Sequence, residues 1–325
     1  MISKANTPDG PGEQRSVAAA VAELTGLAAR FVERIPVGEV NRVFKVETTG
    51  GVFVVKVFQY PDWPEAGKLQ WVERQLNERG VAHPPLIHYT RDEHLFPHGF
   101  AAFEYVEGRN CLEALSVGEL SAADYCRLAG EYLRKVHAIR VSRYGYIGHG
   151  SGTDDDYIEC KLTHDVDERL RAVGDDVHAR LFPPIAKEVE RLLRPLEERF
   201  TPRLLHGDAF PGNGLLIDER RLILVDWDEA MSGIWPEDLA RLAYWFAYPN
   251  PPRGDAGLTN EQVIDFFLRG YGDTEFHPEE LGRAVRALHL VYSADLLSYR
   301  HQTNNMESYA RIMCVIEELL AERSC

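Results

Sequence analysis

The sequence has few cysteines, no long apolar segment and no surplus of basic residues. Its five cysteines show neither the close spacing of a metal site nor the compact framework of a disulfide-rich domain, which favours a reduced, cytoplasmic protein. No early segment combines a basic start with an apolar core, and no apolar run approaches the length that crosses a bilayer. We therefore predict neither secretion nor membrane insertion. The cysteines are Cys111, Cys126, Cys160, Cys314 and Cys325.

Acidic residues outnumber basic residues by 51 to 36, which gives the chain a formal net charge of -15. Nucleic acid backbones demand clustered lysine and arginine, so this composition argues against nucleic acid as a substrate. It is compatible with a cationic small molecule, although acidity is also common in ordinary soluble proteins. A length of 325 residues and a hydrophobic content of 45% are sufficient for two lobes with one cleft.

Residues 203–230, RLLHGDAFPGNGLLIDERRLILVDWDEA, carry the most informative pattern in the chain. A His-Gly-Asp triplet occupies positions 206–208, an asparagine follows at Asn213, and Asp226 ends an apolar run. A nucleoside triphosphate is polyanionic, so its transfer requires divalent cations on oxygen ligands and a carboxylate beside the incoming hydroxyl. We predict that Asn213 and Asp226 hold Mg²⁺ and that Asp208 orients the hydroxyl and accepts its proton.

The segment between the two proposed metal ligands predicts a β-hairpin. Residues 215–217 and 222–225 are short apolar runs separated by the polar residues 218–221. Such a hairpin fixes the distance between Asn213, just before its first strand, and Asp226, just after its second. Asp, Asn, Gly and Pro are also ordinary turn residues, so any one of them alone indicates only a loop. The ordered set favours a nucleotide phosphotransfer site.

The segment H-G-D-x-x-x-x-N, followed by an Asp-Trp pair, resembles the aminoglycoside phosphotransferase and small-molecule kinase family. The resemblance covers most of the chain from about Arg30 onward. It implies an α+β, bilobal protein-kinase-like fold, with a small N-terminal lobe dominated by an antiparallel β-sheet and a larger, mostly helical C-terminal lobe. It also implies ATP or GTP as co-substrate with Mg²⁺.

The domain boundaries are predicted from this fold. Residues 1–15 are expected to form a mobile leader, because their first part is rich in Pro, Gly, Asn and Asp. Residues 16–106 are expected to form the nucleotide-binding lobe, with a hinge at about residues 103–108. Residues 107–325 then form the catalytic and substrate-binding lobe. At the start of the first lobe, Ser16 is expected to cap a short helix.

Lys56 is the most informative residue of the first lobe. It lies inside a predicted apolar strand, where burial of a cation is costly unless an anion pairs with it. In a kinase that anion is the α- and β-phosphate pair, and a helix glutamate holds the lysine in place. We select Glu73 on a helix predicted over residues 64–78, with Glu65 as the competing choice. The strands of this lobe are predicted over residues 29–35, 42–48 and 51–58.

Two further nucleotide contacts are implied by the resemblance. Gly38 and Asn41, in the first turn, loosely resemble the family's phosphate-covering loop, although the turn has no G-x-G-x-x-G pattern and an ordinary hairpin turn is equally compatible. At the hinge, the Glu104 carbonyl and the Val106 N–H are expected to meet the adenine edge. Phe103 would line the pocket behind the base.

The second lobe is predicted to be mainly helical. His206 is expected to brace the catalytic loop, and Asp238, on a helix that runs to Phe246, to tie that loop down as a structural residue. His137, at the end of a helix predicted over residues 122–139, is interpreted as packed or capping. The acids of residues 151–180 are those of a solvated segment or face an amine-bearing acceptor. An aromatic stripe near the C-terminus packs in the core or borders the acceptor cleft; it comprises Tyr292, Leu296, Tyr299 and His301.

The predicted reaction is transfer of the γ-phosphate of ATP or GTP to a hydroxyl of a small molecule. An antibiotic or similar natural product, inactivated by phosphorylation, is the first choice of acceptor. A metabolic kinase for an amino alcohol, amino acid or sugar is the second. A protein Ser/Thr kinase ranks third, because Trp227 and Asp228 follow Asp226 with no D-F-G or A-P-E segment. A non-catalytic nucleotide-binding scaffold ranks last.

Overall fold

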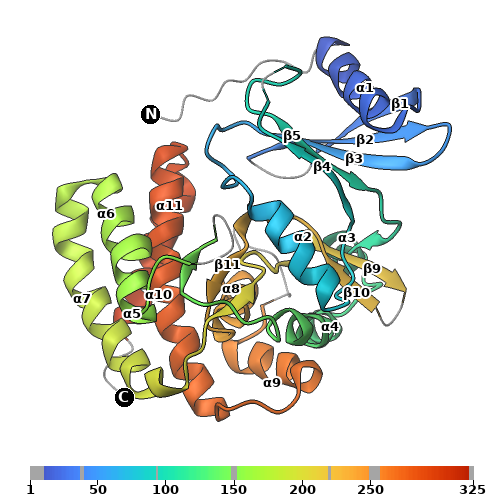
Figure 1. Cartoon of the computed structure of the whole chain (residues 1–325). Coiled ribbons are helices and arrows are strands. Elements are labelled where there is room, and N and C mark those ends of the chain that lie inside the picture. Colours follow the sequence, from blue (N-terminus) through green and yellow to red (C-terminus); the bar gives the residue numbers. More distant parts are fainter. Residues whose placement is uncertain are drawn as a thin grey trace. The chain divides into compact units, whose positions relative to one another are not determined.

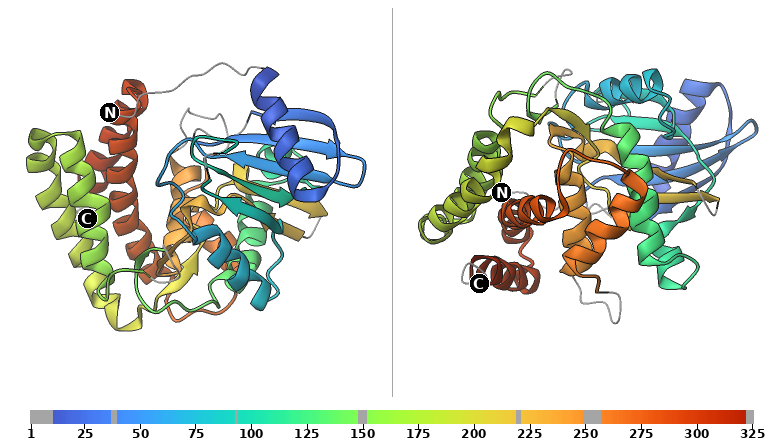
Figure 2. Two further views of the ribbon diagram at one scale, coloured as in Figure 1. Left: turned by 45° about the horizontal axis from the view of Figure 1, so that its top comes forward. Right: turned by 90° about the horizontal axis from the view of Figure 1, so that it is seen from below.

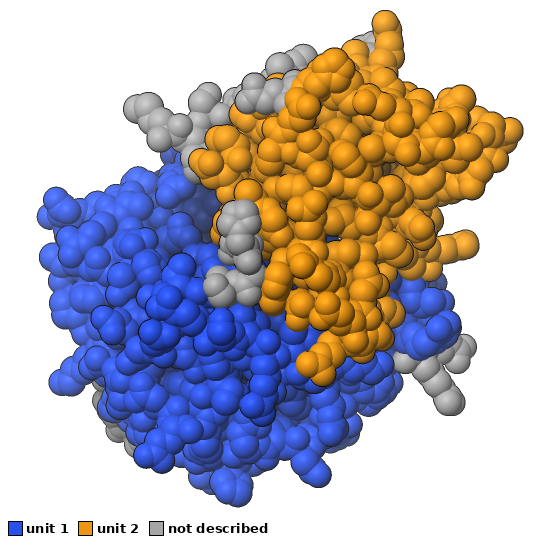
Figure 3. Space-filling view, viewed as in Figure 1, with its two compact units in different colours: residues 1–2, 109–147, 151–325 blue, residues 3–108, 148–150 orange. Residues whose placement is uncertain are grey.

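The computed structural model describes residues 11–36, 40–92, 94–147, 152–218, 221–248 and 257–321 (Figure 1). The chain divides into two compact units (Figure 3). Of the described residues, those between 11 and 108 form the N-terminal unit, and those from 109 to 147 and between 152 and 321 form the C-terminal unit. No helix in the described ranges is both long and apolar enough to cross a membrane.

The N-terminal unit is built on a five-stranded antiparallel sheet with the strand order β1-β2-β3-β5-β4. Its strands are rich in β-branched and aromatic residues, as in VFVVKV of β3, which favour a pleated, half-buried surface. The three strands predicted at the start of this unit are confirmed. The bounds are β1 (Ala29–Ile35), β2 (Arg42–Thr48), β3 (Val52–Val57), β4 (Leu86–Thr90) and β5 (Phe100–Glu104).

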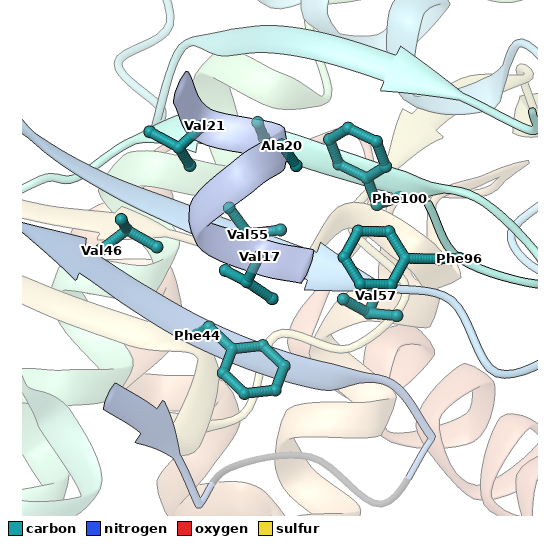
Figure 4. Packing of buried hydrophobic residues seen from close by; sticks show 10 residues of the cluster. Val17, Ala20, Val21, Phe44, Val46, Val55, Val57, Phe96 and Phe100 are labelled. Carbon is teal, nitrogen blue, oxygen red and sulfur yellow. The ribbon is translucent and has the colours of Figure 1, made fainter. Parts of the chain in front are cut away.

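Helix α1 (Pro11–Thr25) packs its apolar face on this sheet. Val17, Ala20 and Val21 of the helix lie among buried side chains of β2, β3 and β5, as Figure 4 shows. The described part of the helix already includes Pro11, five residues before the predicted cap at Ser16. Residues 11–15 of the predicted leader are thus helical, and residues 1–10 lie outside the described residues.

Helix α2 (Lys68–Glu78) begins later than the predicted residue 64. Gly67 adopts a left-handed conformation with φ of 78°, which interrupts helical geometry just before the helix. The helix places Glu73 beside the segment that leads into β4, through a contact with His83.

The C-terminal unit is mainly helical and carries two small sheets, β10-β9-β6 and β7-β11-β8. The hairpin of β9 and β10 confirms the predicted pair of strands. The strands are β6 (Arg109–Asn110), β7 (Gly145–Tyr146), β8 (Arg203–Leu205), β9 (Gly214–Asp218), β10 (Arg221–Leu224) and β11 (Met231–Gly233). The helices are α3 (Cys111–Ser116), α4 (Ala122–Val136), α5 (Tyr157–Cys160), α6 (Glu168–Val173), α7 (Asp175–Leu193), α8 (Pro236–Ala247), α9 (Asn260–Tyr271), α10 (Pro278–Gln302) and α11 (Met306–Ala321).

Helix α10 lies in the middle of the helical part and contacts α6, α7, α8, α9 and α11 (Figures 1 and 2). Helices α4 and α9 approach each other closely at two glycines. A Cβ on Gly130 would lie 2.3 Å from the Phe267 carbonyl oxygen, and one on Gly270 would lie 1.8 Å from that of Arg127. Larger side chains at these positions would push the two helices apart, so the glycines fix α4 where it supports the catalytic loop.

The acidic segment over residues 151–180 is mostly helical from residue 152 onward, and Asp156, Asp175 and Asp176 lie at helix starts, in agreement with a solvated segment. It forms α5, a π-helical turn η1 (Lys161–Asp167), α6 and the start of α7. Asp165 is buried there, because Lys161 supplies an opposite charge at 2.8 Å. Other acids of the segment, such as Asp155, are exposed surface partners of arginine.

Candidate active site

The predicted catalytic loop follows β8 in the C-terminal unit and leads into β9. Side chains from two other elements hold its backbone. The Tyr125 hydroxyl of α4 donates to the Ala209 carbonyl at 3.2 Å, and the Asn110 amide donates to the Gly212 carbonyl at 2.8 Å. The loop is therefore anchored at both of these points rather than extended freely from the sheet.

Gly207 occupies a position that only glycine fits well. Its φ is +79°, in the left-handed region, and an added Cβ would lie 2.1 Å from the Glu229 carbonyl oxygen. The tight turn at Gly207 brings the loop against the segment that follows Asp226 and positions Asp208 beyond it.

Asp238 of α8 supports this turn from beneath. Its two carboxylate oxygens accept hydrogen bonds from the backbone N–H of His206, at 2.9 Å, and of Gly207, at 2.8 Å. His137 donates from Nε2 to the same carboxylate at 3.0 Å. Burial opposes ionisation of Asp238, but the hydrogen bond from His137 and the neighbouring histidines lower its pKa. The carboxylate is thus an ionised, fully buried brace.

His206 connects the two sides of the loop. The Asp208 N–H donates to Nδ1 at 3.2 Å, so Nδ1 carries no proton, and Nε2 then donates to the Val225 carbonyl at 3.1 Å. The imidazole ring also packs on Trp227, with ring centroids 4.5 Å apart. These contacts join Asp208 to the strand end that carries Asp226.

Asp208 is held by Asn213. The Asn213 amide nitrogen donates to Oδ2 of Asp208 at 2.7 Å and to its backbone carbonyl at 3.0 Å. Because the nitrogen is directed at Asp208, the amide oxygen is the atom that could ligate a cation. Burial, and next the charge of Asp226, raise the pKa of Asp208 to about 7, while Arg241 opposes this rise.

Asn213 and Asp226 lie at corresponding ends of the hairpin. The Val225 N–H donates to the Asn213 carbonyl at 2.9 Å, which continues the pairing of Gly214 with Leu224. Asp226 has a φ of 66°, an uncommon conformation for a non-glycine residue, and begins a short turn through Glu229. The hairpin therefore places the two predicted metal ligands next to each other.

The oxygen donors of this loop fit a magnesium ion better than a metal that is bound entirely by protein. No group of three or more His, Cys, Asp or Glu side chains arranged to hold a metal occurs in the described ranges. Mg²⁺ is commonly held by one or two protein ligands, with water and substrate phosphate in its other positions. The amide oxygen of Asn213 and the carboxylate of Asp226 match that donor set.

In the N-terminal unit, Lys56 lies on β3 with only 5% of its surface exposed. The side chain of Glu73 contacts residues other than Lys56, its predicted partner. Its Oε2 pairs with His83 at 2.8 Å, and its Oε1 accepts from Asn77 at 2.9 Å, because α2 packs against the segment that contains His83. Its competitor Glu65 forms an ion pair with Lys68. The partnership of Glu73 with Lys56 stays a prediction.

The first predicted turn is described only in part. Gly38 lies outside the described residues. Asn41 is buried, and its side-chain oxygen accepts from the Gln59 N–H at 3.2 Å, which connects the start of β2 to the residues after β3. This contact gives Asn41 a structural task in addition to the predicted one at the nucleotide.

The predicted hinge has a distinctive backbone arrangement. The Glu104 N–H donates to the Pro85 carbonyl at 2.9 Å, which continues the antiparallel pairing of Phe103 with Leu86. The return hydrogen bond of such a pair would come from the N–H of Pro85, which proline lacks. The Glu104 carbonyl is the predicted acceptor for adenine, and Val106, two residues later, is the predicted donor.

Sequence reasoning missed Arg241 of α8, whose charge opposes the raised pKa of Asp208. Tyr292 of α10, whose pKa is raised by burial and by the charge of Asp208, was named only as one residue of a stripe. The spacing of Arg241, three residues after Asp238 on the same helix, was an available signal. Tyr292 was part of the predicted aromatic stripe, but only the fold of α10 against α8 shows which residues of that stripe it brings towards the loop.

Comparisons with known proteins agree with this geometry. Residues 32–282 match the model of a family described as "Phosphotransferase enzyme family". A thermostable mutant of aminoglycoside phosphotransferase APH(4)-Ia, solved with ADP and hygromycin B, covers 95% of this chain and 99% of its own, with 18% identity and a TM-score of 0.70. No curated protein sequence matches the chain.

Two further solved structures have the same fold. Spectinomycin phosphotransferase APH(9)-Ia, in complex with ADP and spectinomycin, is 14% identical over 94% of this chain and 97% of its own, with a TM-score of 0.59. A putative fructosamine-3-kinase from Thermobifida fusca YX-ER1 is 20% identical over 92% of this chain and 98% of its own, with a TM-score of 0.58. These similarities confirm the predicted α+β, protein-kinase-like fold.

Proposed function

The chain belongs to the phosphotransferase enzyme family, and on that premise we propose that it transfers the γ-phosphate of ATP or GTP to a hydroxyl of a small molecule. The observation that carries this proposal is the arrangement of Asp208, Asn213 and Asp226. One amide fixes the catalytic carboxylate, and the hairpin holds both oxygen ligands beside it. Such a site suits positioning and charge neutralisation, which supply most of the rate in phosphoryl transfer.

Each residue has a separate role in this proposal. Asp208 orients the acceptor hydroxyl and accepts its proton. Asn213 and Asp226 would hold Mg²⁺, which neutralises phosphate charge when bound. Asp238 and His206 position the loop that carries Asp208. In the other unit, Lys56 would contact the α- and β-phosphates.

The hinge residues are assigned to the adenine base, with Phe103 behind it and the backbone of Glu104 and Val106 at its edge. Pro85, which lies opposite Glu104, supports this assignment, because proline has no N–H to donate to the Glu104 carbonyl. We place the reaction in the cytoplasm, where ATP and reduced thiols occur together. The free thiols of Cys111, Cys126 and Cys160 are consistent with that compartment.

An antibiotic or similar natural product with a sugar hydroxyl is the first acceptor class. It is supported by the solved relatives that bind hygromycin B and spectinomycin. A metabolic acceptor, such as a sugar derivative, is the second, and the putative fructosamine-3-kinase of the same fold supports it. Both classes use the same catalytic residues.

The test is ADP or GDP release by the full-length protein with Mg²⁺ across a panel of acceptors, with Asp208→Ala as control. The panel contains aminoglycosides, nucleoside and macrolide antibiotics, amino alcohols and sugars. Stimulation by one class, absent in Asp208→Ala, is the expected result and identifies the acceptor. If no acceptor stimulates release while nucleotide still binds, the proposal is wrong for these acceptor classes, and the result favours an acceptor outside the panel or a nucleotide-binding scaffold.

A second variant tests the metal assignment. Asp226→Ala removes a proposed Mg²⁺ ligand, so nucleotide affinity should fall in the presence of Mg²⁺ and change little when EDTA removes the metal. Isothermal titration with and without Mg²⁺ distinguishes the two conditions. Equal affinities of Asp226→Ala and the parent protein with Mg²⁺ would contradict the assignment.

A further inference from the structure

A small cavity lies in the C-terminal unit where α8, α10 and the π-helical turn η1 meet. Its volume of about 10 Å³ is close to the space that one water molecule needs. Charged side chains from each of the three elements line it: Asp165 from η1, Glu237 and Arg241 from α8, and Asp295 from α10, with Tyr292 between them. A cavity that holds one water does not require four charged side chains around it, so their presence here needs a physical explanation.

The cavity lies beside the part of α8 that holds the catalytic loop. Two of its lining residues, Glu237 and Arg241, flank Asp238 on that helix, and Asp238 accepts hydrogen bonds from the N–H groups of His206 and Gly207, directly before Asp208. All these residues belong to the same compact unit. A group that occupied the cavity would therefore extend from the position where the acceptor hydroxyl is expected.

Two of the carboxylates already have a donor on each oxygen. Lys161 donates to Asp165 at 2.8 Å and to Glu237 at 2.7 Å. The second oxygen of Asp165 accepts from the Tyr146 hydroxyl at 3.2 Å, and that of Glu237 accepts from the Tyr157 hydroxyl at 2.9 Å. Both carboxylates are buried, so these bonds offset the cost of removing their charge from water.

The third carboxylate is different. Asp295 is 33% exposed, and its contact is with Nε of Arg169 at 3.0 Å. That N–H is not aimed at the oxygen, since Nε has no hydrogen bond in the part of the chain that the structure describes. Asp295 is therefore an accessible carboxylate with an incomplete set of donors.

Arg241 is the corresponding cation. Its guanidinium lies over the ring of Tyr292 at 4.7 Å, and its approach to Glu237 is 3.6 Å, longer than a hydrogen bond. Its buried Nε has no hydrogen-bond partner within the described ranges. A ligand oxygen could complete the bonding of Arg241, and a ligand ammonium that of Asp295.

We propose that this cavity is the inner end of the acceptor site and that it selects a hydroxylated molecule with a single amino group over a polyamine. The inference rests on the proposed function and names its substrate class. Asp295 binds the ammonium group, and Arg241 binds an oxygen substituent near the hydroxyl that is phosphorylated.

The charge balance of the wall gives the reason for a single amine. Three carboxylates, Asp165, Glu237 and Asp295, are opposed by three cations, Lys161, Arg169 and Arg241. Removing an ammonium group from water is costly unless a carboxylate pairs with it. Asp295 is the exposed carboxylate of the three, whereas Asp165 and Glu237 are buried against Lys161, so further ammonium groups would lose hydration without an accessible partner among these carboxylates.

The experiment measures kcat/KM of the full-length protein with Mg²⁺ and ATP for three groups of probes. The neutral group is glucose and ribitol, the single-amine group is ethanolamine, glucosamine and erythromycin, and the polyamine group is kanamycin A and neomycin B. We expect the highest kcat/KM within the single-amine group, at least about tenfold above the polyamines. A polyamine as the best acceptor would overturn the inference and leave the proposed function intact. A neutral molecule as the best acceptor would also overturn the inference and leave the proposed function intact. If no probe of any group is phosphorylated, the proposed function itself is overturned.

Two variants test the residues. Asp295→Asn should raise KM for the best single-amine acceptor at least about tenfold with little change in kcat, and Asp265→Asn, an exposed ion-pair residue of α9, is the matched control. Arg169→Gln removes one opposing cation and should lower KM for the polyamines several-fold. Arg171→Gln is its control, because Arg171 lies exposed on the same helix and pairs with Asp167.

The outcomes of these variants separate binding from folding. Thermal melting identifies any variant that has lost its fold, and Asp295→Asn remains informative if Arg169→Gln does not fold. An unchanged KM in folded Asp295→Asn would overturn the role of Asp295. If KM for the polyamines is equal in Arg169→Gln and Arg171→Gln, the charge-balance argument is overturned.

Discussion

Asp208 lies in the catalytic loop and Asp238 lies on α8 beneath it, and the two carboxylates differ in their hydrogen-bond donors. Asp238 receives two backbone N–H groups and the imidazole of His137, and its pKa is lowered. Asp208 receives a side-chain donor from Asn213, and burial and then the charge of Asp226 raise its pKa. Aspartate is thus ionised with both oxygens hydrogen-bonded at position 238, whereas at position 208 it has fewer hydrogen-bond donors.

This difference shows how the loop separates stability from reactivity. A carboxylate whose oxygens are all occupied cannot accept a substrate proton, so Asp238 can only hold the loop in place. A carboxylate with few donors costs folding free energy but keeps an oxygen for the acceptor hydroxyl. Substitutions at the two positions should therefore affect different measurements.

The largest effect is expected for Asp208→Asn. The amide keeps the shape of the side chain but cannot accept a proton, so kcat should fall by about 10³-fold. The free energy of unfolding of the protein without nucleotide should not decrease, because the substitution removes a carboxylate that lies near two others. Steady-state kinetics and urea denaturation measure the two quantities. A stably folded Asp208→Asn variant with near-normal kcat would show that Asp208 is not the catalytic aspartate.

Asp238→Asn should give the opposite pattern in stability. The amide group would direct N–H donors at a backbone N–H and remove the charge that pairs with His137. We expect the free energy of unfolding to fall by about 3 kcal/mol, as for other broken buried pairs. Urea denaturation of the variant beside Asp265→Asn, an exposed aspartate on α9, tests this value. A loss below about 1 kcal/mol would contradict the bracing role.

Much of this comparison could be predicted from the sequence. The His-Gly-Asp triplet, Asn213 and Asp226 form a local pattern, so their spacing predicted the loop and the hairpin that the structure shows. Local rules also predicted the strands of the N-terminal unit, because alternating apolar residues specify them. Asp238 was expected to support the loop only through resemblance to related kinases.

The sequence was less informative where contacts join distant segments. Glu73 was chosen by its interval from Lys56, but packing of α2 gives it His83 as a partner. Asp165 belonged to an acidic segment typical of a solvated helix start or loop, yet it is buried with Lys161 and Tyr146 as its hydrogen-bond donors. No pattern in the sequence pairs these residues, because the contacts depend on how the helices pack.

The smallest predicted effect extends the comparison to two buried histidines. His137 contacts the carboxylate of Asp238, whereas His289 on α10 donates from Nε2 to the Ala240 carbonyl at 2.9 Å. The Nδ1 atom of His289 has no hydrogen-bond partner in the described ranges. Burial lowers the pKa of His289 to about 4, so its neutral form is the one that fits the folded protein.

The sign of the resulting pH dependence follows from the lowered pKa. The unfolded chain has a histidine pKa of about 6.5, so it binds a proton before the folded protein does. The stability contributed by neutral His289 is complete above about pH 6.5 and is lost as the pH falls towards 4. At pH 5 the loss should be about 2 kcal/mol. Urea denaturation of His289→Gln at pH 7 and pH 5 should show a smaller decrease than the parent protein. His301→Gln, an exposed position on the same helix, should retain the parent decrease; an equal decrease in both variants would show that acid acts on other groups.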